Sequence, residues 1–185
     1  MLGLAALVSL SGCGTFTNVP AQIKIAKVDG ATLTYEKPDA TDGWRTVKID
    51  PAILTLQGEP GSIGVTFEQM KVDYFQINNT RVPATEVPVM DLRVSIRVES
   101  SHFPNNPGAA PLNQADIGKT VYAAKTEVEL PIITRHVSTY GGKLDVNVGA
   151  LWAQVQLIGN DDAGFPASLT VYVPINFIGP PNGTR

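Results

Sequence analysis

The strict alternation of apolar and polar side chains over residues 92–99 constrains the fold more than any other feature. In this stretch, LRVSIRVE, every second side chain is apolar. Successive side chains of a β-strand point to opposite faces, so the pattern predicts a half-buried strand with Ile96 on its core face. The same period of two recurs over 125–130 and 143–148, and a helical period of 3.6 fits none of the three stretches.

Seven further strands are predicted where apolar-rich runs lie between turn-forming residues. They cover residues 23–28, 31–36, 45–49, 53–57, 63–77, 151–158 and 167–177. The separators are rich in Gly, Asn and Asp, which accept the backbone conformations of tight turns. Asp29-Gly30 is a two-residue signal for a hairpin between its flanking strands. No stretch shows a convincing helical pattern, and we expect an all-β protein.

Many short strands without intervening helices favour an antiparallel β-sandwich of immunoglobulin-like type, and a small β-barrel is the alternative. Residues 155–164, followed by a strand with Leu169, Val171 and Val173, resemble the closing hairpin of immunoglobulin-like domains in many bacterial lipoproteins. This resemblance implies the fold and no function. With 185 residues, of which 43% are hydrophobic, the chain suits one domain, which we expect over 22–179 with a tail at 180–185.

The start of the chain carries an apolar run over residues 2–10, long enough for a signal peptide and about half the length of a membrane-spanning helix. The next residues complete Leu10-Ser11-Gly12-Cys13, which resembles the lipobox of bacterial prolipoproteins. That resemblance implies removal of residues 1–12 and a lipid on Cys13. Several acyl chains on one residue give stable anchoring. We therefore expect Cys13 and a short tether over 13–21 to hold the protein at a membrane.

The residues around Cys13 also bear on where the protein is found. Gly14 follows the cysteine where Asp would favour retention in the inner membrane of a Gram-negative cell, so we expect an exported protein anchored at the outer membrane. Cys13 is the single cysteine, and stability must then come from core burial without a disulfide. No Lys or Arg precedes the apolar run, which leaves the start of translation open.

Charge and composition argue against several classes of function. The chain has 14 Lys and Arg against 17 Asp and Glu, with no basic run, which argues against a nucleic-acid partner. With two histidines and no motif that joins a nucleophile, base or metal ligands, we expect no enzyme and no cofactor. The leading prediction is a structural or protein-interaction lipoprotein with a partner protein in the cell envelope. The alternative is a binding module for a glycan or small ligand.

Trp152 and Tyr172 are the first candidate binding residues. Each lies on the strand face opposite the apolar positions, and they become neighbours on one face if 151–158 and 167–177 pair as a hairpin. They then form an aromatic surface for a sugar or peptide, unless they only cover a partly buried outer sheet.

Two loops supply the remaining candidates. Asn160, Asp161 and Asp162 offer oxygen ligands for calcium, although these residue types also simply form turns. The Pro-rich stretch 103–117 carries Phe103 and Leu112, which a merely solvated connection does not need. We expect this stretch to be an exposed loop that contacts a partner.

Overall fold

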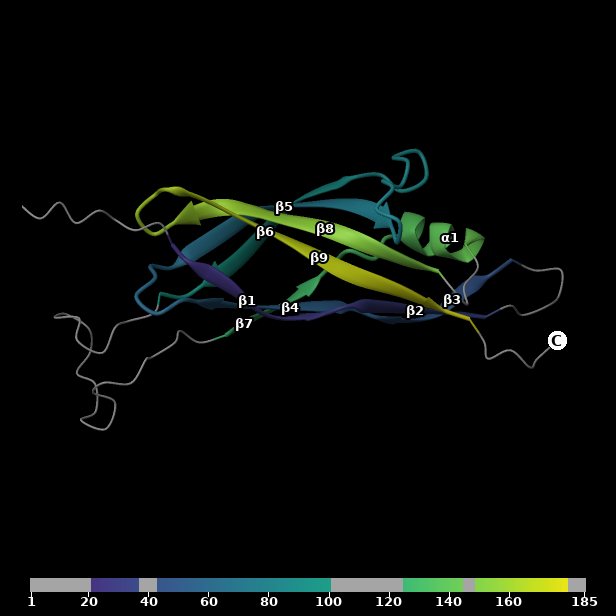
Figure 1. The fold of residues 1–185 in the computed structure, drawn as a ribbon, viewed down its shortest axis with the longest axis horizontal. Coiled ribbons are helices and arrows are strands. Elements are labelled where there is room, and N and C mark those ends of the chain that lie inside the picture. Colours follow the sequence, from purple (N-terminus) through teal and green to yellow (C-terminus); the bar gives the residue numbers. More distant parts are fainter. Residues whose placement is uncertain (1–20, 37–42, 101–124, 145–148, 180–185) are drawn as a thin grey trace, which may run out of the picture.

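The computed structural model describes residues 21–36, 43–100, 125–144 and 149–179 (Figure 1). Cys13, the apolar run before it, Phe103, Leu112 and the tail lie outside these residues. The described chain forms two β-sheets and one short helix, so the all-β prediction is confirmed.

The residues that the structure describes form nine strands and one helix. The strands are β1 Ile23–Asp29, β2 Ala31–Glu36, β3 Arg45–Asp50, β4 Ala52–Gly58, β5 Val65–Gln76, β6 Met90–Val98, β7 Thr126–Leu130, β8 Ala150–Asp161 and β9 Pro166–Ile178. The helix α1 spans Arg135–Lys143 between β7 and β8. Each predicted strand except 143–148 corresponds to one of these strands to within three residues.

The strand order is that of an immunoglobulin-like sandwich. A three-stranded sheet β1-β4-β7 packs against a six-stranded sheet β3-β2-β9-β8-β5-β6 (Figure 1). The first sheet matches the immunoglobulin order A-B-E, and β5, β8 and β9 match C, F and G. One pairing departs from the antiparallel prediction, because β2 runs parallel to β9. No strand ladder joins the two sheets within the described ranges, and the larger sheet is curled, an arrangement that fits the predicted sandwich as well as the alternative of a small barrel.

The core lies between the sheets and follows the alternation seen in the sequence. On β6, Ile96 and Val98 are buried while Arg93 and Ser95 are exposed, so the predicted core face is confirmed. Tyr74 of β5 is fully buried, and its hydroxyl donates to the carbonyl of Ile132 at 2.7 Å. Burial raises the pKa of Tyr74 well above its ordinary value. The Tyr74 ring adds apolar area to the core, and its hydroxyl is satisfied by a hydrogen bond.

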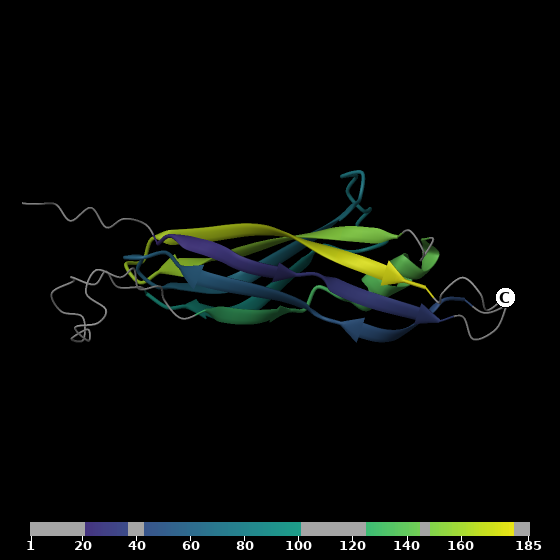
Figure 2. The ribbon, with the colours of Figure 1, turned by 60° about the horizontal axis from the view of Figure 1, so that its bottom comes forward.

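Asp29-Gly30 does not form the predicted hairpin. β1 pairs with β4 and β2 pairs with β3, and the register runs on unchanged from Asp29 opposite Ile53 to Thr32 opposite Asp50. The four strands are one long two-stranded ribbon that passes from the smaller sheet into the larger one (Figure 2). Gly30 lies where the ribbon passes between the sheets. A larger residue would not fit there, because its Cβ would come within 2.7 Å of the Pro174 carbonyl oxygen.

The helix α1 contradicts the expectation of a chain without helices. Thr134 caps its N-terminus by accepting from the backbone N–H of Val137 at 3.2 Å. Contacts with the sheets hold it further, since the Tyr35 hydroxyl donates to the Ser138 carbonyl and Gln76 Nε2 to the Tyr140 hydroxyl, both at 2.8 Å. The predicted strand over 143–148 is wrong at its start, where Lys143 ends the helix, and residues 145–148 lie outside the described chain.

Candidate functional site

Four side chains form an aromatic platform on the outer face of the six-stranded sheet. Phe75 of β5 lies opposite Trp152 of β8, and Trp152 lies opposite Pro174 of β9, which makes one row across three adjacent strands. Tyr172 lies two residues before Pro174 on the same face of β9. Trp152 is 37% and Tyr172 57% exposed, so solvent reaches both rings. We call Phe75, Trp152, Tyr172 and Pro174 the aromatic platform.

Trp152 and Tyr172 therefore lie on one face of the sheet, as predicted, but they are diagonal neighbours on adjacent strands and do not lie directly opposite each other. Their direct cross-strand partners are Pro174 and Gln154. Diagonal neighbours in an antiparallel pair lie about 7–8 Å apart, still within reach of aromatic side chains. Sequence analysis identified two members of the platform and missed Phe75 and Pro174.

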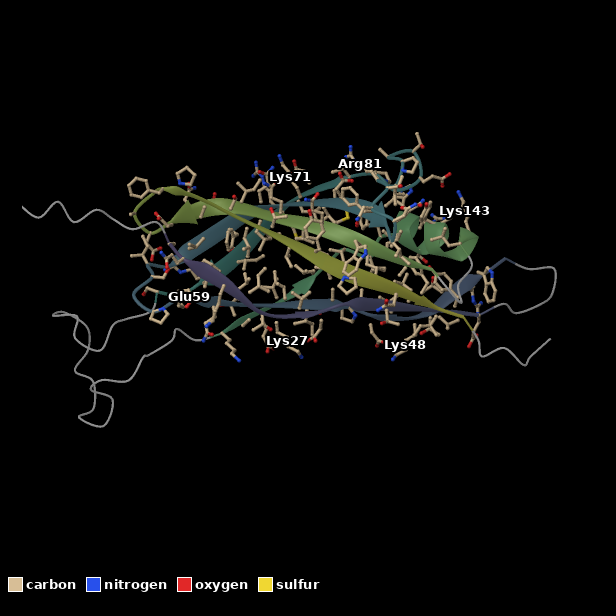
Figure 3. The ribbon with its side chains drawn as sticks, in the orientation of Figure 1. Lys27, Lys48, Glu59, Lys71, Arg81 and Lys143 are labelled. Carbon is tan, nitrogen blue, oxygen red and sulfur yellow. The ribbon has the colours of Figure 1, made fainter. Side chains whose placement is uncertain are left out.

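The second row of the platform runs from Tyr172 to two polar residues, Gln154 and Asp73. Gln154 lies opposite both Asp73 and Tyr172, and its Nε2 donates to the Tyr172 hydroxyl at 2.9 Å. Arg81 Nη2 pairs with Asp73 Oδ2 at 2.7 Å. Figure 3 shows Arg81 and Lys71 on one surface of the molecule, with Lys27 and Lys48 on the opposite one. The platform thus offers flat apolar rings beside an amide, a carboxylate and a guanidinium.

The calcium candidates lie at the β8–β9 turn, where their carboxylates have protein partners. Asp161 Oδ1 accepts the backbone N–H groups of Ala163 at 3.0 Å and Phe165 at 2.9 Å. Asp162 is held by Arg97 through two bonds of 2.5 and 2.8 Å, while Asn160 is exposed on β8 just before the turn. No cluster of three or more His, Cys, Asp or Glu in the described part of the chain could hold a metal ion. Calcium binding stays a prediction, and a calcium ion here would have to displace Arg97.

The Arg97–Asp162 pair gives a testable pH dependence. Its hydrogen bonds from the guanidinium lower the pKa of Asp162 below the ordinary value of 3.8. A depressed folded-state pKa adds stability that is present above about pH 4 and is lost as pH falls through the folded value. Both side chains are about two-fifths exposed, so we expect Asp162→Asn to cost at most about 1 kcal/mol at pH 7.

The measurement is urea unfolding of both proteins at pH 7 and at pH 2.5. The difference in unfolding free energy between them should shrink at the lower pH. Glu99→Gln is the control, because Glu99 approaches the same arginine only at 3.5 Å and is more exposed. A difference that stays constant between the two pH values would contradict the role given to this ion pair.

A groove of about 400 Å³ lies at the same end of the sandwich as the β8–β9 turn. Ala21 and Ile23, where the described chain begins, line one side of it, and Pro166 and Leu169 of β9 line the other. Buried Phe67 contributes to its lining. Polar Gln22 and Ser168 complete its lining, and the groove lies beside the point where the described chain begins.

No protein-family model, no curated protein and no solved structure matches this chain. Among the residues that the structure describes, no helix is long and apolar enough to cross a membrane.

Proposed function

We propose that this chain is a non-catalytic envelope lipoprotein, held at the outer membrane by lipid on Cys13, that binds another envelope component through the aromatic platform. The sequence Leu10-Ser11-Gly12-Cys13 supports the anchor. The outward row of Phe75, Trp152 and Pro174, in which Trp152 is exposed and the other two are partly buried, supports the binding role and is the observation that carries it.

The concentration of aromatic side chains at one place on the sheet supports a binding surface. Four residues along the same three strands from the row of Phe75, Trp152 and Pro174, the outward row is Lys71, Gln156 and Thr170, all polar. A sheet face that contacts only solvent needs no exposed aromatic side chains and can be polar along its whole length. Exposed apolar patches with polar surroundings mark interaction sites, and Trp and Tyr are enriched among residues that dominate binding energy.

The position of the platform suits presentation away from the anchor. Ala21, the last residue of the expected tether and the first that the structure describes, lines the same groove as Pro166 at the start of β9. Trp152 lies nine residues before Asp161 along β8, a distance of about 30 Å at the rise of a β-strand. The platform thus lies far from the end at which the tether enters.

A protein surface is the first candidate partner because Trp and Tyr supply large contact area at low entropic cost. A glycan is the second candidate. It is favoured by Gln154, Asp73 and Arg81, whose amide, carboxylate and guanidinium groups could bond hydroxyls beside a sugar ring stacked on Trp152.

The platform predicts a specific binding defect. Trp152→Ala and Tyr172→Ala in the native lipoprotein should each weaken partner binding about 30-fold, corresponding to ~2 kcal/mol, if these rings are central contacts. Both side chains are exposed, and we expect thermal stability to change little. The measurement is cross-linking in intact cells, followed by separate protease and glycosidase digestion of the product to identify its class.

Val47→Ala is the matched control, because Val47 is an exposed apolar side chain, 41% exposed, on edge strand β3 away from the platform. The cross-linked product should persist in this variant. The same product at the same yield in both platform variants would remove the platform from the proposed function.

A further inference from the structure

We infer that the end of the sandwich at the β8–β9 turn docks against the lipid surface that holds Cys13, with the Phe165 side chain entering the membrane interface. This inference rests on the proposed lipid anchor and adds an orientation to it.

The length of the tether keeps this end near the lipid. Seven residues separate Cys13 from Ala21, and even fully extended they span about 25–30 Å. Strand β9, with 13 residues, is about 43 Å long at the rise of a β-strand. The tether is therefore shorter than the body, and it enters beside Pro166, the first residue after Phe165.

The turn presents Phe165 in a fixed conformation. The Phe165 N–H donates to Asp161 Oδ1, and its carbonyl accepts from the Asp161 N–H, both at 2.9 Å. Gly164 supplies the left-handed backbone between them, with φ of +85°. Phe165 is nevertheless 46% exposed, so a rigid turn holds an aromatic ring in solvent. A residue whose backbone is already fixed in this way loses little further backbone freedom when its side chain enters an apolar phase.

The surroundings of Phe165 favour an apolar contact over an electrostatic one. The groove beside the turn is lined by Ile23, Phe67 and Leu169. Among the nearby charges Arg97 pairs with Asp162 and Glu99, and Lys24 with Glu59, so acids outnumber bases. Paired charges of both signs give no net attraction to anionic headgroups, whereas aromatic rings partition into the membrane interface. We therefore expect docking that added salt does not release.

Depth-dependent fluorescence quenching tests this orientation. The full lipoprotein, with Cys13 acylated, is placed in phosphatidylcholine vesicles with or without brominated acyl chains. In Phe165→Trp, brominated lipid should quench the added tryptophan and its emission should shift to the blue. The unsubstituted protein supplies the background, because Trp152 lies on the distant platform and Trp44 packs near Gly142 at the end of α1.

Ile77→Trp is the matched control, since Ile77 is 58% exposed just beyond the end of β5, in the same half of the sheet as Trp152. Brominated lipid should leave this variant at the background level. Equal quenching of both variants, or no quenching of Phe165→Trp, would overturn the orientation. Mass spectrometry of the same samples separates the two proposals: an acylated Cys13 with an unquenched Phe165→Trp refutes the docking alone, whereas an unmodified Cys13 refutes the anchor and the docking with it.

Discussion

Ile96→Asp is expected to lower the free energy of unfolding by about 4 kcal/mol or more, and its thermal unfolding should lie far below that of the parent chain. Ile96 is 6% exposed and lies on the face of β6 that packs into the core between the sheets. A carboxylate there has no charged partner and must lose its hydration or take up a proton. The expected cost is about 4 kcal/mol or more, against a total stability of about 5–15 kcal/mol for a typical protein.

Ser95→Asp is the matched control, because it adds the same charge one residue earlier on the exposed face of the same strand. Its effect should stay within about 0.5 kcal/mol, helped by the neighbouring arginines on that face. Thermal unfolding followed by circular dichroism compares the two variants. Wild-type thermal stability in Ile96→Asp would show that the core face of β6 has been assigned incorrectly.

The second large effect is expected at Gly159, in β8. This glycine lies opposite Phe67, next to the bulge in β5 where the register shifts between Phe67 and Gln69. A Cβ at residue 159 would overlap the Thr66 carbonyl oxygen and the Phe67 Cα, which are backbone atoms that cannot rotate aside. Gly159→Ala should therefore force the two central strands apart, at a cost of about 3 kcal/mol or more.

Gly43→Ala is the control for this substitution, since nothing lies within 4 Å of the position that its Cβ would take. It should leave stability unchanged or raise it slightly, because alanine restricts the unfolded chain. Hydrogen exchange of amides in β5 and β8 should speed up in Gly159→Ala and not in Gly43→Ala. Unchanged exchange and unfolding in Gly159→Ala would mean that the β5 bulge can move to accept a methyl group.

The strands could be predicted because their period is local, but the faces of β5 could not. Val65 and Phe67 point inward, and the same parity continued along the strand would bury Phe75. The bulge between Phe67 and Gln69 reverses the parity, so Met70, Val72 and Tyr74 are buried and Phe75 joins the outer face. A bulge depends on the neighbouring strand, which explains why Phe75 was missed as a member of the aromatic platform.

The helix was missed because its sequence is a poor helix former. The segment RHVSTYGGK contains two adjacent glycines and two β-branched residues, all with low intrinsic propensity. Gly141 is required there because Tyr35 and Phe177 pack where its Cβ would lie. The one local signal was Thr134, a residue type favoured at the N-cap. Tertiary contacts supply the remaining stabilisation of the helix, and these contacts cannot be predicted from the local sequence alone.

The parallel pairing of β2 with β9 joins positions at opposite ends of the described chain, from Ala31 with Ile175 to Thr34 with Ile178. Contacts so remote in sequence form late, because a long loop must close before they contribute. The β1–β4 and β2–β3 ribbon can assemble early from nearby residues, yet one edge of β2 stays open until β9 arrives. When the chain is made from its N-terminus, the larger sheet thus remains incomplete until its last strand, β9, is present. Such a delay in folding suits a polypeptide that is expected to cross a membrane before it folds.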